Sequence, residues 1–503
     1  MEGKVRWWCI FLSLMLMACT TSVSDNGADA VVPDFAGAVV PYNIAPLNFC
    51  LDGKAYARAK VEVNGEHGSI AVRAHNGRVM FPKKKWHRLL EAEKGNTLTV
   101  SIECQQVNES TNQQAVVRHS SPEGRKVEKF FSFTVSLDSI DRYVTYRIID
   151  PSFEVWHKVE IRERDLTGWG ERVLSDWKHT DNSCMNCHVH GSARGNLSFF
   201  HLRGPKGGTI LNRDGSLRKL TLKTDDMPVA ATYGDFHPSG RFAVFTWNTV
   251  IPSLRALGSH RMEVYDTASD MLVADFDAHT MCFSRLTSET DAYETFPTFS
   301  PDGQYIYFCR ASYHPLPDSV RQTCYSLVRI PFDEQTGTQG DSIEMVWDAE
   351  QEGGSASFPK FSPDGRFLLF CRSDYGTFPI WHRETRLMMM DMKTGVVDSL
   401  EVLRAEDASS SYHSWSSNGR WIAFASKRGD GMFGRVWMAH VDADGRVAKP
   451  FRLPQRDPEH DRLFLRSYNL PDLGDTPVPF DVRDIRRLRN RVAAEMFTSA
   501  TQP

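Results

Sequence analysis

The sequence predicts an all-β protein, in which an N-terminal immunoglobulin-like sandwich is followed by a β-propeller of about six blades. Two observations lead to this prediction. Strands with alternating apolar and polar side chains fill residues 39–150, and one turn motif occurs four times between residues 236 and 420, each time before an apolar strand. With 503 residues, of which 41% are hydrophobic and 24% charged, the chain is long enough for more than one soluble domain.

The first 19 residues have the features of an export signal. Lys4 and Arg6 precede an apolar run, which ends in Leu16-Met17-Ala18-Cys19. This ending resembles a bacterial lipoprotein signal, in which the cysteine becomes the acylated first residue of the mature chain. We therefore expect a lipid on Cys19, a polar tether over residues 20–38, and a place in the cell envelope, anchored to a membrane and facing the periplasm or the cell surface. A cleaved signal with an incidental cysteine is the alternative.

The sandwich is predicted from a period of two, which is typical of half-buried strands. Every second residue is apolar in the segments 57–63, 98–104 and 131–137. Nothing in residues 39–150 has the pattern of a catalytic site. The net charge of −4 gives no basic footprint, so we expect no nucleic-acid partner.

Residues 151–196 are expected to form a connector. Its apolar residues are loosely spaced like one face of a short helix, and it leads into Cys184-Met185-Asn186-Cys187-His188. Cys-x-x-Cys-His is the attachment motif of c-type haem, because two thiols at this spacing reach the two vinyl groups and the histidine ligates the iron. Haem is attached outside the cytoplasm in bacteria, which agrees with the export signal. We therefore expect haem c as the cofactor.

Two other chemistries use a Cys-x-x-Cys pair. A redox-active or disulfide pair would normally begin a helix in a thioredoxin-like βαβ unit, which the surrounding sequence does not indicate. A zinc site would need two more ligands at suitable spacing, and no second Cys-x-x-Cys or His-x-x-His pair lies nearby. Both remain as alternatives to haem.

His188 is expected to be the proximal ligand of the haem iron, because it directly follows the second cysteine of the motif. His190 lies too close along the chain to reach the opposite face of the haem. The candidates for the distal ligand are His201, His237 and His260, with Met227 and Met281 behind them.

The other cysteines allow disulfides in an exported protein. Cys50 with Cys104 is one possible pair, and others are possible among four cysteines of the propeller region: Cys282, Cys309, Cys324 and Cys371. Buried free thiols are the alternative, since Cys309 and Cys371 each end an apolar strand at the same place in the repeat.

The repeat behind the propeller prediction starts with a turn. Phe236-His237-Pro238-Ser239-Gly240-Arg241 returns at residues 299–304, 361–366 and, in weakened form, 415–420. Proline presets φ, Asp or Ser bonds back to the backbone, and glycine accepts the positive φ that closes a hairpin. Several such sheets bury their faces by packing radially, and residues 197–222 supply one further degenerate blade. The propeller is expected over 197–470.

These repeats resemble the TolB-type propeller repeats. The order of lipoprotein signal, sandwich, Cys-x-x-Cys-His and propeller is similar to that of uncharacterised lipoproteins of Bacteroidetes-type bacteria. The resemblance implies the fold, because propellers host unrelated functions. TolB proteins carry neither the haem motif nor this sandwich, so a role like that of TolB does not follow.

Two further segments are predicted to be structural. The methionines at 388–390 and 392 lie in an expected blade strand and are interpreted as core rather than as a copper site. In the tail 471–503, residues 481–492 have the pattern of a capped helix with a basic face. Contact of that face with anionic headgroups or an acidic partner is the alternative to simple solvation.

Three functions compete at this stage. The first is electron transfer by the haem, with the propeller as a docking platform for a redox or envelope protein whose identity the sequence does not give. The second is a binding or scaffolding lipoprotein for proteins or glycans. The third is a haem enzyme, which is less favoured because no constellation of nucleophile, base and oxyanion donors is visible. We expect electron transfer, and no catalytic residues are assigned.

Overall fold

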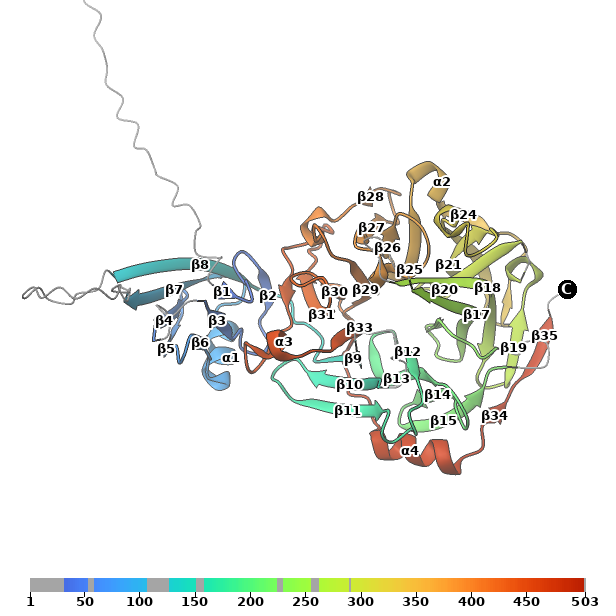
Figure 1. Cartoon of the computed structure of the whole chain (residues 1–503), viewed down its shortest axis with the longest axis horizontal. Helices are drawn as coiled ribbons and strands as arrows, with labels where there is room; N and C mark the ends of the chain where they lie inside the picture. Colours follow the sequence, from blue (N-terminus) through green and yellow to red (C-terminus); the bar gives the residue numbers. More distant parts are fainter. Residues whose placement is uncertain are drawn as a thin grey trace, which may run out of the picture.

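The computed structural model describes residues 31–52, 58–105, 126–150, 158–223, 229–254, 262–288 and 291–501. It contains a β-sandwich and a β-propeller that lie next to each other, with the sandwich on the left in Figure 1. The predicted all-β class and propeller are therefore confirmed. Among the described residues, no helix has the length and apolar character needed to cross a membrane.

The N-terminal domain consists of two sheets and one helix. The larger sheet has the order β2 (Val39–Pro41), β8 (Lys126–Ser136), β7 (Thr97–Gln105), β4 (Lys60–Asn64), β5 (Ser69–Arg73). The smaller sheet has the order β1 (Val31–Val32), β3 (Phe49–Leu51), β6 (Arg78–Val79). The sheets pack through Phe49 and Phe131, whose ring centroids lie 5.9 Å apart. Helix α1 (Lys83–Ala92) adds the fully buried Trp86 to the same core.

Six sheets of four or five strands form the blades of the propeller, and we number them along the chain. Blade 1 contains β9 (Tyr143–Ile149), β10 (Glu160–Asp165), β11 (Glu171–Asp176) and β33 (Ser467–Gly474). Blade 2 contains β12 (Met185–Gly191), β13 (Arg194–Leu202), β14 (Gly208–Arg213) and β15 (Ser216–Thr221). Blade 3 contains β16 (Gly234–Phe236), β17 (Phe242–Leu254), β18 (Met262–Asp275) and β19 (Thr280–Phe283).

Blades 4 to 6 complete the ring seen in Figure 1. Blade 4 contains β20 (Ala292–Phe299), β21 (Tyr305–Ser312), β22 (Ser326–Asp333), β23 (Thr338–Gln339) and β24 (Glu344–Trp347). Blade 5 contains β25 (Ser355–Phe361), β26 (Phe367–Ser373), β27 (Arg386–Asp391) and β28 (Val397–Asp398). Blade 6 contains β29 (Ser410–Trp415), β30 (Trp421–Ser426), β31 (Arg435–His440) and β32 (Phe451–Arg452). Short helices lie in the loops: α2 (Ala349–Glu352), α3 (His460–Leu463), η3 (Arg285–Thr287), η4 (Val320–Gln322), η5 (Pro379–Trp381) and η6 (Glu401–Leu403).

The ring is closed by the C-terminal part of the chain. Strand β33 pairs antiparallel with β9, so blade 1 combines residues from both ends of the propeller. Two later strands, β34 (Glu495–Met496) and β35 (Thr498–Thr501), then pair in parallel with β15 and β19 at the edges of blades 2 and 3. The same terminal segment thus closes one seam and joins two neighbouring blades.

The structure contradicts the predicted connector with a short helix at 151–196. Its described residues form β10, β11 and β12, and the propeller begins at β9 instead of residue 197. Of the apolar residues that suggested a helix face, Val173 and Leu174 lie on β11, Leu166 and Trp169 lie in the loop between β10 and β11, and Trp177 directly follows β11. Trp156 lies outside the described residues.

The repeated turns adopt the predicted geometry. Their glycines, which include Gly303 and Gly365, all have φ between 65° and 72°. In each later copy a serine hydroxyl donates to the acidic or amide side chain two residues on, as from Ser300 to Asp302.

The methionines of β27 are core residues, since Met389 and Met390 are buried. The four cysteines of the propeller region are free thiols rather than disulfides: Cys282, Cys309, Cys324 and Cys371. Cys50 is also free, and the side chain of Cys104 lies outside the described residues.

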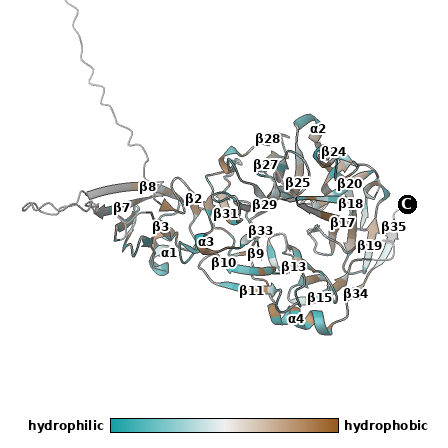
Figure 2. Ribbon diagram, in the orientation of Figure 1, coloured by the Kyte–Doolittle hydropathy of each residue, from teal (hydrophilic) through white to brown (hydrophobic). Residues whose placement is uncertain are grey.

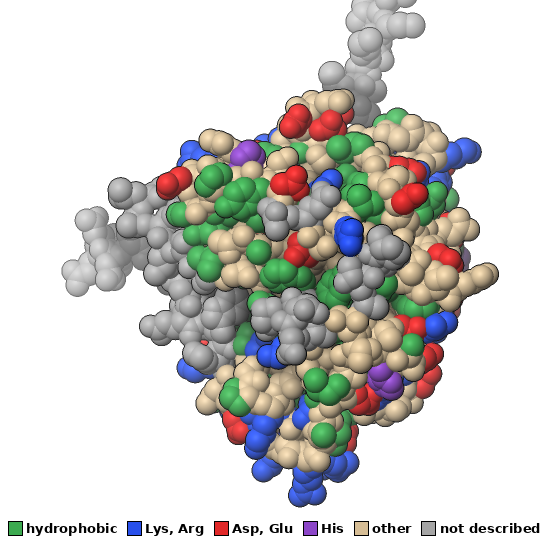
Figure 3. Space-filling view, turned by 90° about the vertical axis from the view of Figure 1, so that its right-hand side faces the viewer, with side chains coloured by type: hydrophobic (Ala, Val, Ile, Leu, Met, Phe, Trp, Pro, Cys, Tyr) green, Lys and Arg blue, Asp and Glu red, His purple; other side chains and the backbone are tan. Residues whose placement is uncertain are grey.

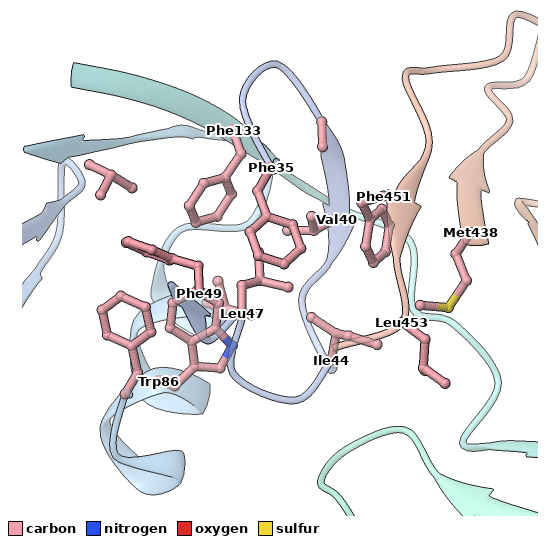
Figure 4. Packing of buried hydrophobic residues seen from close by; sticks show 14 of the residues in the cluster. Phe35, Val40, Ile44, Leu47, Phe49, Trp86, Phe133, Met438, Phe451 and Leu453 are labelled. Carbon is pink, nitrogen blue, oxygen red and sulfur yellow. The ribbon is translucent and has the colours of Figure 1, made fainter. Parts of the chain in front are cut away.

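One apolar core joins the sandwich to blade 6. Figure 4 shows Val40 and Ile44 of the sandwich facing Met438, Phe451 and Leu453, which lie in and beside the outer strands of that blade. The ammonium of Lys449 adds an ion pair to Asp34 at 2.7 Å. The two domains are therefore packed as one body at this side of the ring.

The predicted C-terminal helix is α4 (Val482–Arg491). Asp481 caps it by accepting bonds from the backbone N–H groups of Arg483 and Asp484, and Figure 2 shows hydrophilic and hydrophobic residues mixed along its length. Figure 3 shows Lys and Arg side chains gathered at the lower edge of the molecule, at the level of α4 in Figure 1. Arg489 of this helix does not belong to a solvated basic face, because its side chain is buried and binds Asp181 at 2.7 Å.

Candidate cofactor site

The inner strands of five blades share a β-bulge. In β12, β20, β25, β29 and β33 the register with the neighbouring strand shifts within the strand, and one residue at such a shift has a positive φ of 46–56°. Bulges of this kind re-aim a side chain, and a bulky residue at positive φ is rare outside functional or strongly constrained sites. We call these five the ring residues: Cys187, Phe296, Phe358, Tyr412 and Leu470.

All five ring residues line one cavity at the centre of the propeller, which has a volume of about 530 Å³. Blade 3 contributes Tyr233 next to its inner strand. The rings of Tyr233 and Phe296 lie 4.4 Å apart, and those of Phe358 and Tyr412 lie 4.8 Å apart, so aromatic side chains form much of the wall. The volume falls in the range of about 300–1,000 Å³ that is usual for ligand sites.

The predicted motif lies on the wall of this cavity. Cys184 immediately precedes β12, Cys187 is the ring residue of blade 2, and His188 follows it, and all three line the cavity. The bulge leaves Cys187 and His188 outside the regular pairing of β12 with β13, so their side chains are free of the usual strand alternation. The structure thus brings the three residues of the motif together on one inner strand.

His188 is buried, with 7% of its surface exposed, and neither of its ring nitrogens makes a hydrogen bond within the described part of the chain. Burial, helped by the nearby His190 and Arg147, lowers the pKa of the imidazole to about 3. The backbone carbonyls of Thr145 and Leu470 partly oppose this lowering of the pKa, but neither is placed to form a hydrogen bond with the imidazole. The ring is therefore neutral at physiological pH, which is the form that ligates a metal.

The two thiols are in a similar environment. Burial raises the pKa of Cys187 to about 11 and also raises the pKa of Cys184, whose sulfur accepts a bond of 2.9 Å from the amide of Asn186. Both thiols are free. A redox-active pair needs a depressed thiol pKa, so this site lacks the activation that such a pair requires. Within the described residues no group of three or more His, Cys, Asp or Glu side chains is arranged to hold a metal ion.

Of the expected distal ligands, none described by the structure lies in the cavity. Both ring nitrogens of His201 are bound, to the hydroxyl of Thr209 at 2.9 Å and to the carbonyl of Thr232. His237 is held in its turn by the hydroxyl of Ser239 at 2.8 Å and the carbonyl of Gly303 at 3.3 Å. Both histidines were predicted as distal ligands from residue type alone. Their positions in β13 and in the first repeated turn direct the side chains into these hydrogen bonds instead of into the cavity. Met281 is a buried core residue, and His260 and Met227 lie outside the described residues.

Sequence reasoning missed the other residues of the cavity. They come from all six blades and include Arg147, Arg203 and Trp381 besides the aromatic ring residues. A signal for part of this set exists in the repeat. Tyr233, Phe296, Phe358 and Tyr412 each lie three residues before the aromatic residue that opens a turn motif.

Two observations support the fit of these residues to a c-type haem. Two thiols and an imidazole converge on one cavity wall, and the imidazole is buried with both nitrogens unpartnered among the described residues. An orphaned buried polar group costs about 1–3 kcal/mol, and ligation of a haem iron would satisfy one of the two nitrogens. The aromatic wall suits a flat, apolar macrocycle.

No protein-family model matches this chain, and no curated protein matches it. Solved structures with a partial likeness include a Mycobacterium tuberculosis puromycin-hydrolyzing peptidase, with 13% identity and a TM-score of 0.30, over 52% of this chain and 40% of the peptidase. They include Synechocystis apocarotenoid oxygenase, with 11% identity and a TM-score of 0.38, over 85% and 93%. Kuenenia stuttgartiensis hydrazine synthase has 12% identity and a TM-score of 0.44, over 68% and 47%. This chain thus spans less than half of the peptidase and of the synthase, and likenesses this weak carry no argument about function.

Proposed function

We propose that this protein is an exported lipoprotein that carries one covalent c-type haem in the central cavity of its propeller and works in electron transfer in the cell envelope. The proposal rests on one observation above all. The Cys-x-x-Cys-His motif lies on the wall of a central cavity, and its histidine is buried, neutral and without a hydrogen-bond partner among the described residues.

Each part of the site has a role in this proposal. Cys184 and Cys187 would hold the haem by thioether bonds, and His188 would ligate its iron. The haem would supply one-electron redox chemistry when bound. The aromatic side chains of the cavity would exclude water from the haem. Such burial is one way in which a protein tunes the reduction potential of its haem.

The central test is covalent attachment. Protein produced with a c-type maturation system should gain the mass of one haem and give a pyridine haemochrome with two thioether bonds. The variant Cys184→Ser with Cys187→Ser should gain none, while Cys309→Ser with Cys371→Ser, two buried thiols elsewhere, should keep the haem. An unmodified wild-type chain would overturn the proposal.

The envelope location is part of the proposal and rests on the sequence, since Cys19 lies outside the described residues. The order of signal, sandwich, Cys-x-x-Cys-His and propeller, which is similar to that of uncharacterised lipoproteins of Bacteroidetes-type bacteria, supports it. Acyl chains on Cys19 would anchor the protein stably, because each buried methylene contributes about 0.8 kcal/mol. Cys19→Ala should move the protein from the membrane fraction to the soluble periplasmic fraction. Retention in washed membranes without detergent would show that lipid is not the anchor.

A second function is favoured by the cavity itself. A cavity of about 530 Å³ beside His188 falls in the range usual for small-molecule sites, which suits ligand binding or turnover. The spectrum of the reduced protein with carbon monoxide separates the two. A six-coordinate haem that binds carbon monoxide slowly or not at all fits electron transfer, and rapid binding with saturable turnover of nitrite or peroxide fits an enzyme.

A further inference from the structure

Two arginine side chains line the same cavity as the Cys-x-x-Cys-His motif. Arg147 comes from β9 in blade 1 and is only 8% exposed, and Arg203 directly follows β13 in blade 2. One terminal nitrogen of Arg147 donates to the side-chain oxygen of Asn186, between the two cysteines, while its Nε has no partner among the described residues. Arg203 donates to the carbonyl of Ala230 at 3.3 Å.

Neither guanidinium forms an ion pair with a carboxylate of the described residues. The two acidic residues that line the same cavity are bound elsewhere. Asp150 accepts a bond from Arg466 at 2.8 Å, and Asp472 accepts one from the backbone N–H of His190 at 2.7 Å. A buried cation without a counter-charge is costly, so the cavity wall carries positive charge that an anion would neutralise.

Both arginines act electrostatically on the motif. Burial raises the pKa of Cys184 and of Cys187, and both arginines oppose that rise at both thiols. Arg147 also lowers the pKa of His188, after the larger effects of burial and of His190. Two guanidiniums from different blades therefore act on the same small region of the cavity.

We propose that Arg147 and Arg203 form a binding site for an oxyanion beside the motif. A guanidinium offers parallel N–H groups that match the two oxygens of a carboxylate or a similar anion, and such charge-assisted bonds are about twice as strong as neutral ones. Asn186 would hold Arg147 in place, because its side chain accepts from that guanidinium. This inference goes beyond the proposed function, since it requires only the cavity and its arginines.

The oxyanion bound by the two arginines has two candidate sources, which are a free small oxyanion and a carboxylate of the haem. The propionates of a haem lie on the edge of the macrocycle opposite the vinyl groups, so thioether bonds to Cys184 and Cys187 would direct the propionates away from this wall. The arginines lie at the cysteine side, which favours the free oxyanion. The haem-free and haem-loaded forms distinguish the two sources.

Calorimetric titration with formate and with nitrite tests the site. The haem-free protein with Cys184→Ser and Cys187→Ser should bind at least one of these anions saturably. Arg147→Gln and Arg203→Gln should each weaken binding about 10- to 100-fold, as expected for a charged hydrogen bond of about 1.5–3 kcal/mol. Arg213→Gln, which removes a surface ion pair between Arg213 of blade 2 and Asp277 of blade 3, should leave affinity unchanged.

Folding is checked in parallel by thermal unfolding, and Arg147→Lys provides a variant that keeps the charge and loses the planar fork. It should bind more weakly than wild type and more tightly than Arg147→Gln. The haem-loaded protein should bind the same anion if the site takes a free oxyanion rather than a haem carboxylate. If it does not, and Arg147→Gln shifts its Soret band or reduction potential, the source is a haem carboxylate.

Either source supports the oxyanion site. Binding that is absent from both forms, or that survives intact in both glutamine variants, would overturn it. Covalent haem content, measured in the same samples, reports separately on the proposed function, because neither arginine takes part in thioether attachment.

Discussion

Blades 2 and 5 have the same β-bulge at the same position of the inner strand, but they carry different side chains there. Cys187 and Phe358 both occupy a bulge of the inner strand, with φ of 56° and 53°. Phe358 stacks on Phe296 with ring centroids 3.9 Å apart, whereas Cys187 presents a thiol to the cavity and is followed by the unpartnered His188. The repeat provides the position, and a single blade provides the reactive groups. In this propeller, function is best sought where one blade departs from the others.

The largest expected effect comes from giving blade 2 the side chain of blade 5. In Cys187→Phe the backbone should be retained, since phenylalanine occupies the equivalent bulge in blades 4 and 5. Covalent haem should fall severalfold, and any remaining adduct should show the haemochrome of a single thioether bond. Intact mass and the pyridine haemochrome measure both. A persistent spectrum of two thioether bonds would show that Cys187 is not an attachment residue.

An intermediate effect is expected from removing an aromatic ring residue. Phe296 is 3% exposed and packs against Tyr233 and Phe358, so Phe296→Ala should cost about 3–5 kcal/mol of the free energy of unfolding. Haem attachment should remain. Urea unfolding gives the measurement, and Met345→Ala, at an exposed site, should change stability by less than about 0.5 kcal/mol. A loss below about 1 kcal/mol would contradict a structural role for the aromatic positions.

The smallest effect concerns pH. Burial lowers the pKa of His188 in blade 2 and of His413 in blade 6 to about 3. The unfolded chain takes up these protons near pH 6.5 while the folded chain does not, so stability is full above that pH and declines as pH falls toward 3. Each histidine should contribute a slope of up to about 1.4 kcal/mol per pH unit.

The comparison uses haem-free protein, in which His188 is not ligated. His188→Gln and His413→Gln should each flatten the decline of the urea midpoint between pH 6 and pH 4. In haem-loaded protein only His413→Gln should do so, because iron ligation would keep the His188 proton off in this range. An unchanged slope in both variants would show that these histidines become protonated in the folded state.

The sequence predicted the parts of the fold that are locally encoded. The turns around Gly303 and Gly365, and α4 with its cap at Asp481, follow from residues within a few positions of each other. Blade 1 was missed because β9 pairs with β33, more than 300 residues later, and no local pattern reports such a pairing. The segment around β11 was mistaken for a helix face because its apolar residues, from Leu166 to Trp177, fall partly on the strand and partly in the loops beside it and do not alternate strictly.

The candidate site divides in the same way. The motif from Cys184 to His188 is continuous in the chain and was found directly. Arg147, Arg203 and Trp381 belong to different blades and meet only when the ring is complete. Residue type alone suggested His201 and His237, but their hydrogen bonds to neighbouring strands and turns place them outside the cavity.

The closing of the ring by β33 also sets an order in which the exported chain becomes complete. Strand β12, which carries the motif, lies roughly 280 residues before β33 and would leave a translocation channel first. Until β33 pairs with β9, blade 1 lacks its inner strand and the ring is open, so Cys184 and Cys187 are accessible to partners too large to enter the closed cavity. If haem is attached as proposed, this open seam is the stage at which a large maturation enzyme would reach the motif.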